Sequence, residues 1–117
     1  MTFDSELERQ VSEILTEAGV EIERGSQELL GRPDFRIIGT NKLIFVHGCY
    51  WHRHSCSKGQ QLPKKNLMYW IGVFSSRVNR DREVRNGLIK QGWSVRTIWE
   101  CEIEAFKSWA VVDRLAA

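Results

Sequence analysis

The sequence predicts an α/β domain in which a central mixed β-sheet is flanked by helices. Three stretches place apolar residues at helical spacing, and several short apolar stretches are bounded by turn residues. The predicted elements follow the order helix, hairpin, loop, long helix, strand, helix, which is typical of layered α/β proteins. A length of 117 residues suffices for one hydrophobic core, so we expect a single domain over residues 1–117.

The first predicted element is an amphipathic helix over residues 4–18 that ends at Gly19. Glu8 lies at the edge of its apolar stripe, where position alone favours a solvated glutamate over an active-site acid. A short strand is expected to follow over residues 20–23. The residues of the apolar stripe are Leu7, Val11, Ile14, Leu15 and Ala18.

The next two strands, over residues 34–38 and 42–46, are predicted to form a hairpin around a Gly-Thr-Asn turn. Asp34 begins this hairpin and His47 follows its end. Both residues are therefore expected at its open end, with a carboxylate beside the histidines of the following loop.

The second half of the chain predicts a long helix over residues 67–91 that ends at Gly92, a strand over 94–99 and a closing helix over 102–115. The residues expected to face the core are Trp70, Val73, Phe74, Val78, Val84, Leu88 and Ile89 in the long helix, and Ile103, Phe106, Trp109 and Val112 or Ala110 in the closing helix.

The net charge of +2 conceals an asymmetry along the chain. Residues 1–33 carry eight acids and three bases, whereas residues 34–117 carry seven acids and fourteen bases. Within residues 58–90 there are eight bases and two acids. This basic region predicts a polyanion site such as nucleic acid, with a solvated helix face as the alternative interpretation.

The distribution of apolar residues does not predict a membrane span. No apolar run approaches the roughly 18–20 residues of a membrane span, and the acidic N-terminus does not resemble a signal peptide. We therefore expect a cytoplasmic protein whose three cysteines are reduced or metal-bound.

A metal site is predicted at Cys49-x4-His54-x-Cys56, closed by Cys101 from a distant part of the chain. Three thiolates and one imidazole form a four-coordinate Cys3His set that suits Zn²⁺ and has no open position for water. The site would then be structural. The alternative is that these cysteines are simply buried, as free cysteines often are.

If the metal takes His54, then His47 and His52 remain, close to Asp34. An aspartate with two histidines is suited to metal-assisted hydrolysis, in which the carboxylate holds Mg²⁺ and one histidine acts as base on water. The adjacent aromatic pairs in this region could stack on DNA bases, although core packing is the more frequent role of such residues. These aromatics are Tyr50, Trp51, Tyr69 and Trp70.

The chain contains, in order, the strings Gly31-Arg32-Pro33-Asp34-Phe35, Ile44-Phe45-Val46-His47-Gly48-Cys49-Tyr50-Trp51-His52, Asn79-Arg80-Asp81, Gly92-Trp93 and Ile98-Trp99-Glu100-Cys101-Glu102. Together they closely resemble the very short patch repair (Vsr) family of DNA mismatch endonucleases. The resemblance implies a restriction-endonuclease-like fold. It also implies nicking on the 5′ side of the mismatched thymine in T:G pairs.

The resemblance also implies residue roles. Asp34 corresponds to the Mg²⁺-binding carboxylate, assisted by the backbone carbonyl of Val46, where the best-known member of the family has threonine. His52 corresponds to the general base, His47 to its partner in contacts with water and phosphate, and Glu8 to an active-site glutamate. The expected zinc ligands are Cys49, His54, Cys56 and Cys101, and the expected DNA contacts are the aromatics Tyr50, Trp51 and Trp70 and the bases Lys64, Lys65, Arg77 and Arg80.

We therefore expect a Mg²⁺-dependent DNA endonuclease with structural Zn²⁺ that nicks one strand of double-stranded DNA beside a mismatch. It is expected to be a monomer in the bacterial cytoplasm, associated with the nucleoid when on DNA and assisted by mismatch-repair proteins. One alternative is a related restriction-type or relaxed-specificity nuclease. The other is a zinc-stabilised DNA-binding module without catalysis. Binding alone would not need Asp34, His47 or His52.

Overall fold

The computed structural model of the chain describes residues 4–107. Its elements are α1 (Asp4–Glu17), β1 (Ile22–Arg24), β2 (Phe35–Ile37), β3 (Lys42–His47), the 3-10 turn η1 (Lys58–Gln60), α2 (Leu67–Lys90), β4 (Ser94–Trp99) and the 3-10 turn η2 (Glu100–Glu102). The strands form one sheet in the order β1-β2-β3-β4, in which β3 and β4 are parallel and the other neighbours are antiparallel. The predicted α/β fold with a mixed sheet is therefore confirmed.

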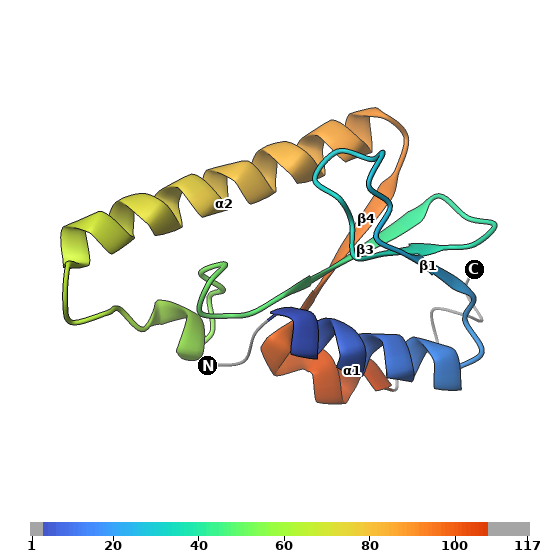
Figure 1. Cartoon of the computed structure of the whole chain (residues 1–117), viewed down its shortest axis with the longest axis horizontal. Helices are drawn as coiled ribbons and strands as arrows, with labels where there is room; N and C mark the ends of the chain where they lie inside the picture. Colours follow the sequence, from blue (N-terminus) through green and yellow to red (C-terminus); the bar gives the residue numbers. More distant parts are fainter. Residues whose placement is uncertain (1–3, 108–117) are drawn as a thin grey trace.

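The two helices cover opposite faces of the sheet (Figure 1). Because side chains alternate along a strand, Ile44 and Val46 of β3 point toward α1, whereas Leu43 and Phe45 point toward α2. The same alternation places His47 on the α2 face. The larger core lies on the α1 face and contains Leu7, Val11, Ile14, Leu15, Phe35, Ile44, Val46, Ile98, Ile103 and Phe106.

The smaller core lies under the C-terminal half of α2, where Val84 and Leu88 are buried one turn apart. Gly92 has a φ of 97° and follows the helix directly, as predicted. Ile89, which the helical pattern predicts to face the core, is 47% exposed. That prediction is wrong, because Ile89 lies about 100° around the helix from Leu88 and only one stripe of α2 meets the sheet.

Residues 103–107 are helical and begin the predicted closing helix. Ile103 and Phe106 are buried in the core on the α1 face, as predicted. Outside the described residues lie the other core positions predicted for this helix, Trp109, Ala110 and Val112. No helix in residues 4–107 combines the length and the apolar character that crossing a membrane requires.

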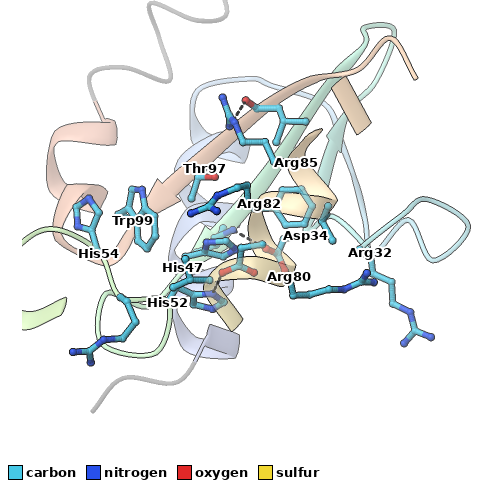
Figure 2. Close-up of a pocket in the computed structure, with 18 of the residues that line it drawn as sticks. Arg32, Asp34, His47, His52, His54, Arg80, Arg82, Arg85, Thr97 and Trp99 are labelled. Atoms are coloured by element: carbon cyan, nitrogen blue, oxygen red, sulfur yellow. Dashed lines mark hydrogen bonds and ion pairs between the residues drawn. The ribbon is translucent and has the colours of Figure 1, made fainter. Parts of the chain in front are cut away.

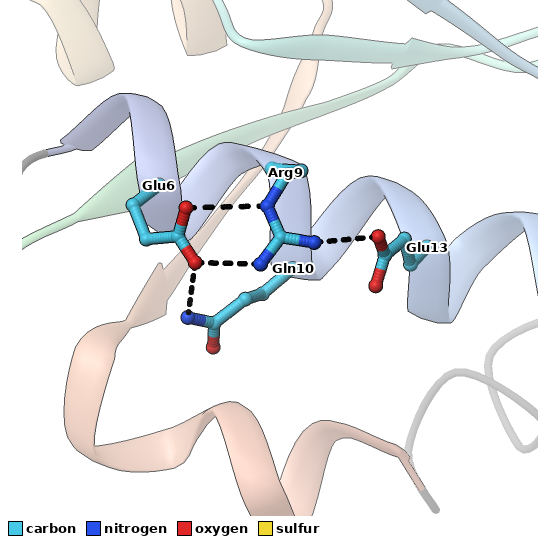
Figure 3. A network of polar contacts seen from close by, with 4 residues as sticks. All are labelled: Glu6, Arg9, Gln10 and Glu13. Carbon is cyan, nitrogen blue, oxygen red and sulfur yellow. Dashed lines mark hydrogen bonds and ion pairs between the residues drawn. The ribbon is translucent and has the colours of Figure 1, made fainter.

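The solvent face of α1 carries a polar network centred on Arg9 (Figure 3). The guanidinium donates to Glu6 one turn before it and to Glu13 one turn after it, both at 2.6 Å. The hydrogen bond from Arg9 lowers the pKa of the Glu6 carboxyl. This bond therefore stabilises the helix above the ordinary pKa of glutamate, and its contribution is lost as the pH falls through the lowered value.

Candidate active site and metal centre

A cavity of about 850 Å³ lies between the sheet and α2; we call it the main cavity. The open end of the β2–β3 hairpin contributes Asp34 and His47, and the following loop contributes His52 (Figure 2). Val46 of β3 and Asp81 of α2 also line the cavity. Cations surround this group, because five arginines but only two aspartates line the cavity. The arginines are Arg32, Arg53, Arg80, Arg82 and Arg85.

Asp34 is held in place by the backbone of β3. Its Oδ2 accepts a hydrogen bond from the Val46 N–H at 2.6 Å. Because the N–H and C=O of one strand residue point to the same side, the Val46 carbonyl lies on the side of β3 that faces Asp34. Pairing of β2 with β3 ends at Phe35 and Ile44, so Val46 lies beyond that ladder. A carboxylate and a backbone carbonyl, both oxygen donors suited to Mg²⁺, thus lie side by side.

His47 and His52 stack on each other, with ring centroids 3.8 Å apart and planes 3° from parallel. The Nδ1 of His52 lies 2.8 Å from Oδ2 of Asp81, and the His52 side chain is only 8% exposed. Since a carboxylate only accepts, Asp81 holds the proton of His52 on Nδ1. Because like charges repel, a positive charge on both stacked imidazoles at once would be costly.

His47, His52 and Asp81 are close enough to be considered as metal ligands, since their donor atoms lie within 4.8 Å of one another. The stacking argues against one ion shared by both rings. Imidazole lone pairs lie in the ring plane, and two parallel planes do not meet at a common point. The two histidines are therefore arranged for proton transfer and hydrogen bonding.

A second cluster brings together Cys49, His54, Cys56 and Cys101, whose donor atoms also lie within 4.8 Å of one another. His54 Nδ1 is 3.8 Å from Cys49 Sγ and 3.5 Å from Cys101 Sγ. In a tetrahedral zinc site the separation between sulfur and nitrogen ligands is about 3.5 Å. The donor set and its spacing therefore fit a four-coordinate metal of the zinc type.

The protonation of these thiols fits a metal-binding role. Burial raises the pKa of the Cys49 thiol to about 12 and also raises that of Cys101. The Gly59 N–H lowers the pKa of Cys56 to about 7. Cys49 and Cys101 are therefore thiols at neutral pH in the protein alone, whereas Cys56 is partly thiolate. A bound cation would favour the thiolate form of all three.

The loop that carries this cluster is braced by Glu100. Its carboxylate accepts a hydrogen bond from the Cys49 N–H at 3.3 Å and another from Lys58 Nζ at 2.7 Å. Gly59 packs so closely on the backbone of His54 that a Cβ atom would collide with it. The loop from Gly48 to η1 is thus fixed against the end of β4.

The aromatic residues predicted to contact DNA form one cluster around Phe74 of α2. The rings of Tyr50, Trp51 and Trp70 lie with their centroids 5.5, 6.5 and 5.9 Å from that of Phe74. All three are partly exposed, whereas Phe74 is buried. These aromatic residues therefore pack against one another and also keep accessible surface, which is consistent both with core packing and with stacking on DNA bases.

The structure does not bring every predicted site residue into the main cavity. Arg80 lines it, whereas Lys64, Lys65 and Arg77 are exposed elsewhere on α2 and the loop before it. Glu8 is half-buried on α1, the helix on the opposite face of the sheet, and is not part of the cavity lining.

Asp81 is a functional candidate that the sequence does not single out. It is one of the two acids among residues 58–90 and the last residue of the string Asn79-Arg80-Asp81. A usable signal was present, because Asp81 interrupts a helical stripe that includes Val78 and Val84. An acid within an apolar stripe needs a buried partner, and the structure supplies His52.

Comparison with known proteins adds the family. Residues 1–58 match the model of the family described as DNA mismatch endonuclease Vsr. The chain is 32% identical to the DNA mismatch endonuclease Vsr of Escherichia coli over 97% of its own length and 74% of that protein. It is 35% identical to the type II nicking enzyme V.XorIIP of Xanthomonas oryzae, covering 82% of this chain and 70% of that enzyme.

A third relative, the type II nicking enzyme V.NmeAIP of Neisseria meningitidis, is 33% identical over 74% of this chain and 61% of that enzyme. The similarity extends over most of the described chain and includes the strand ends and the loop that build the main cavity. This chain belongs to the Vsr family of DNA mismatch endonucleases.

Proposed function

We propose that this protein is a metal-dependent endonuclease that nicks one strand of duplex DNA beside a T:G-type mismatch, in very short patch repair. The observation that carries the proposal is the convergence of Asp34, His47, His52 and Asp81 on one arginine-lined cavity in a member of this family. Relatives of this chain are named as a mismatch endonuclease and as nicking enzymes, which supports the same activity.

His52 is the proposed general base. With its Nδ1 proton held by Asp81, the lone pair is on Nε2, which takes the proton from the attacking water. The developing charge on His52 is stabilised by the Asp81 carboxylate. His47, stacked on the same ring, donates to the water or to a phosphate oxygen, and its proximity keeps the pair from carrying two charges.

Asp34 and the Val46 carbonyl are the proposed ligands of Mg²⁺. Bound there, the ion would neutralise charge on the scissile phosphate and lower the pKa of its water. The arginines around the cavity hold the flanking phosphates, and Arg80 is the one among them that is also predicted from the sequence to contact DNA. Glu8 is also proposed to take part in catalysis, although it lies on α1 outside the main cavity. It would make its contacts only when DNA and metal are bound.

The Cys3His cluster is proposed to bind structural Zn²⁺. It would join the loop after β3 to the end of β4 and so fix the loop that presents His52. We propose that residues 1–117 form a single domain with a restriction-endonuclease-like fold, acting as a monomer with mismatch-repair helper proteins and associated with the nucleoid.

The proposed DNA interface combines stacking with phosphate contacts. Tyr50, Trp51 and Trp70 would stack beside the mismatch, because all three are partly exposed and lie in one aromatic cluster around Phe74. The exposed bases Lys64, Lys65 and Arg77 would contact phosphates along α2.

A nicking assay tests the proposal directly. Duplexes with a T:G or a T:A pair, labelled on either strand, are incubated with Mg²⁺ or with EDTA and separated under denaturing conditions. We expect one Mg²⁺-dependent nick, confined to the T strand of the T:G duplex. Cleavage of both strands at a fixed sequence would favour the restriction-type alternative. Binding without cleavage would favour the DNA-binding module.

A further inference from the structure

A shallow groove lies beside the main cavity, along α2 and the loop before it; we call it the side groove. It has a volume of about 450 Å³ and shares Arg53 and Val78 with the main cavity, so the two spaces are adjacent. This volume is within the range of small-ligand sites, about 300–1,000 Å³. A DNA strand that leaves the main cavity past Arg53 and Val78 would reach the side groove.

The walls of the side groove are apolar and exposed. Leu62 is 54% exposed and Ile71 is 39% exposed, although both are large hydrophobic side chains. The guanidinium of Arg53, which also lines the groove, lies 4.3 Å from the centroid of the Phe74 ring. A planar cation over an aromatic ring offers a surface on which a flat heterocycle can stack.

The polar groups of the side groove are Ser75 and Asn79. Neither side chain hydrogen-bonds to another residue of the described chain, so both are available to a ligand. The Asn79 amide offers a donor and an acceptor together, the pair that matches the edge of a base. Residues 58–80 contain five bases and no acid, so the surroundings favour an anionic ligand.

We propose that the side groove binds a nucleobase displaced from the duplex next to the scissile phosphodiester, and that Asn79 reads the edge of that base. The inference rests on the proposed function and deepens it, since it assigns a residue that determines sequence context. The phosphate lies among Asp34, His47 and His52, and the base passes Arg53 to lie between Leu62 and Ile71.

The reading role is tested with Asn79→Ala against Asn86→Ala, an exposed asparagine on the same helix that lines neither space. Nicking rates are measured on mismatched duplexes that differ only in the base flanking the nick. We expect Asn79→Ala to reduce the preference between best and worst base by about tenfold and Asn86→Ala to leave it unchanged. Equal preferences in the two variants overturn the role of Asn79.

Ile71→Ala tests whether a base occupies the side groove. The control is Ile89→Ala, because Ile89 lies on the same helix and is 47% exposed. The probe is a mismatched duplex with 2-aminopurine at the flanking position, whose fluorescence rises when the base leaves the stack. Wild-type protein and Ile89→Ala are expected to produce the rise, and Ile71→Ala to reduce it at least threefold. A signal that is absent in wild-type protein, or equal in both variants, overturns the base site.

The two proposals fail differently. A wild-type chain that nicks the T:G duplex while both pairs of variants match their controls overturns the side groove and retains the nuclease. A chain that nicks nothing, yet shows the fluorescence contrast between Ile71→Ala and Ile89→Ala, retains the base site and overturns the nuclease.

Discussion

Nδ1 of His52 lies 2.8 Å from Oδ2 of Asp81, and this contact joins the loop after β3 to the middle of α2. The two residues are 29 positions apart, and the His52 ring is held on its other side by the stacked ring of His47. The position and the tautomer of His52 are therefore both set by neighbours, as a general base requires.

Asp81→Asn should lower the nicking rate about 10²- to 10⁴-fold, because an amide no longer stabilises a charged His52 and no longer fixes its tautomer. Binding of the T:G duplex should change little. The measurement is single-turnover nicking across pH, together with fluorescence anisotropy for binding. Glu83→Gln, which removes an exposed acid from the same helix, is the control and should nick normally. Equal rates for the two variants would remove Asp81 from the mechanism.

Cys101→Ser should lose the bound metal and stability together, since Cys101 brings the end of β4 to the other three donors. Metal content by elemental analysis should fall from one zinc per chain to near zero, and the melting temperature should fall with it. Ser55→Ala alters an exposed residue between two predicted ligands and should retain zinc. A Cys101→Ser protein that keeps its zinc and its wild-type melting temperature would show that Cys101 is not a metal ligand.

Gly59→Ala should destabilise the metal loop, because the added methyl group would collide with the His54 backbone. Such overpacking costs about 1–3 kcal/mol. Gly72→Ala is the matched change, since its methyl group meets open space within a helix and should stabilise α2 by up to about 1 kcal/mol. Thermal unfolding of the zinc-loaded proteins gives both values. The prediction fails if Gly59→Ala is as stable as wild type.

Local periodicity was sufficient to predict most elements of the fold within a residue or two. The bounds of α2 and β4 follow from apolar spacing and from Gly92, which are properties of neighbouring residues. The sequence predicts a strand over residues 20–23, whereas β1 spans Ile22–Arg24, because pairing with β2 decides where the strand starts. Ile89 is exposed for a similar reason: tertiary packing, not local sequence, decides which stripe of a helix meets the sheet.

The part of the candidate site that the β2–β3 hairpin positions was predictable from the sequence. Because Asp34 and His47 flank one antiparallel pair, their proximity follows from the strand order, and both line the main cavity. The Asp81 contact was not predictable in this way, since it depends on how α2 crosses the sheet. The same holds for Glu100, which reaches Cys49 across 51 residues.

The double variant Lys64→Ala, Lys65→Ala tests whether the loop before α2 contacts phosphates. Each phosphate contact contributes about 0.9 to the slope of log affinity against log salt, so the slope should decrease by about 1.8. Equilibrium binding of the T:G duplex at several salt concentrations supplies the slope. Lys90→Ala, at the other end of α2, should leave it unchanged. An unaltered slope in the double variant would place the DNA elsewhere.

The most direct test of the whole account is Asp34→Ala, assayed for nicking of the T:G duplex and for zinc content in the same preparation. Asp34 is the proposed Mg²⁺ ligand but lies outside the Cys3His cluster. We predict a loss of nicking by more than about a thousandfold, because several kcal/mol of transition-state stabilisation would be lost. Zinc content and duplex binding should stay at wild-type levels. Mg²⁺-dependent nicking at a near wild-type rate in this variant would contradict the proposed catalytic site.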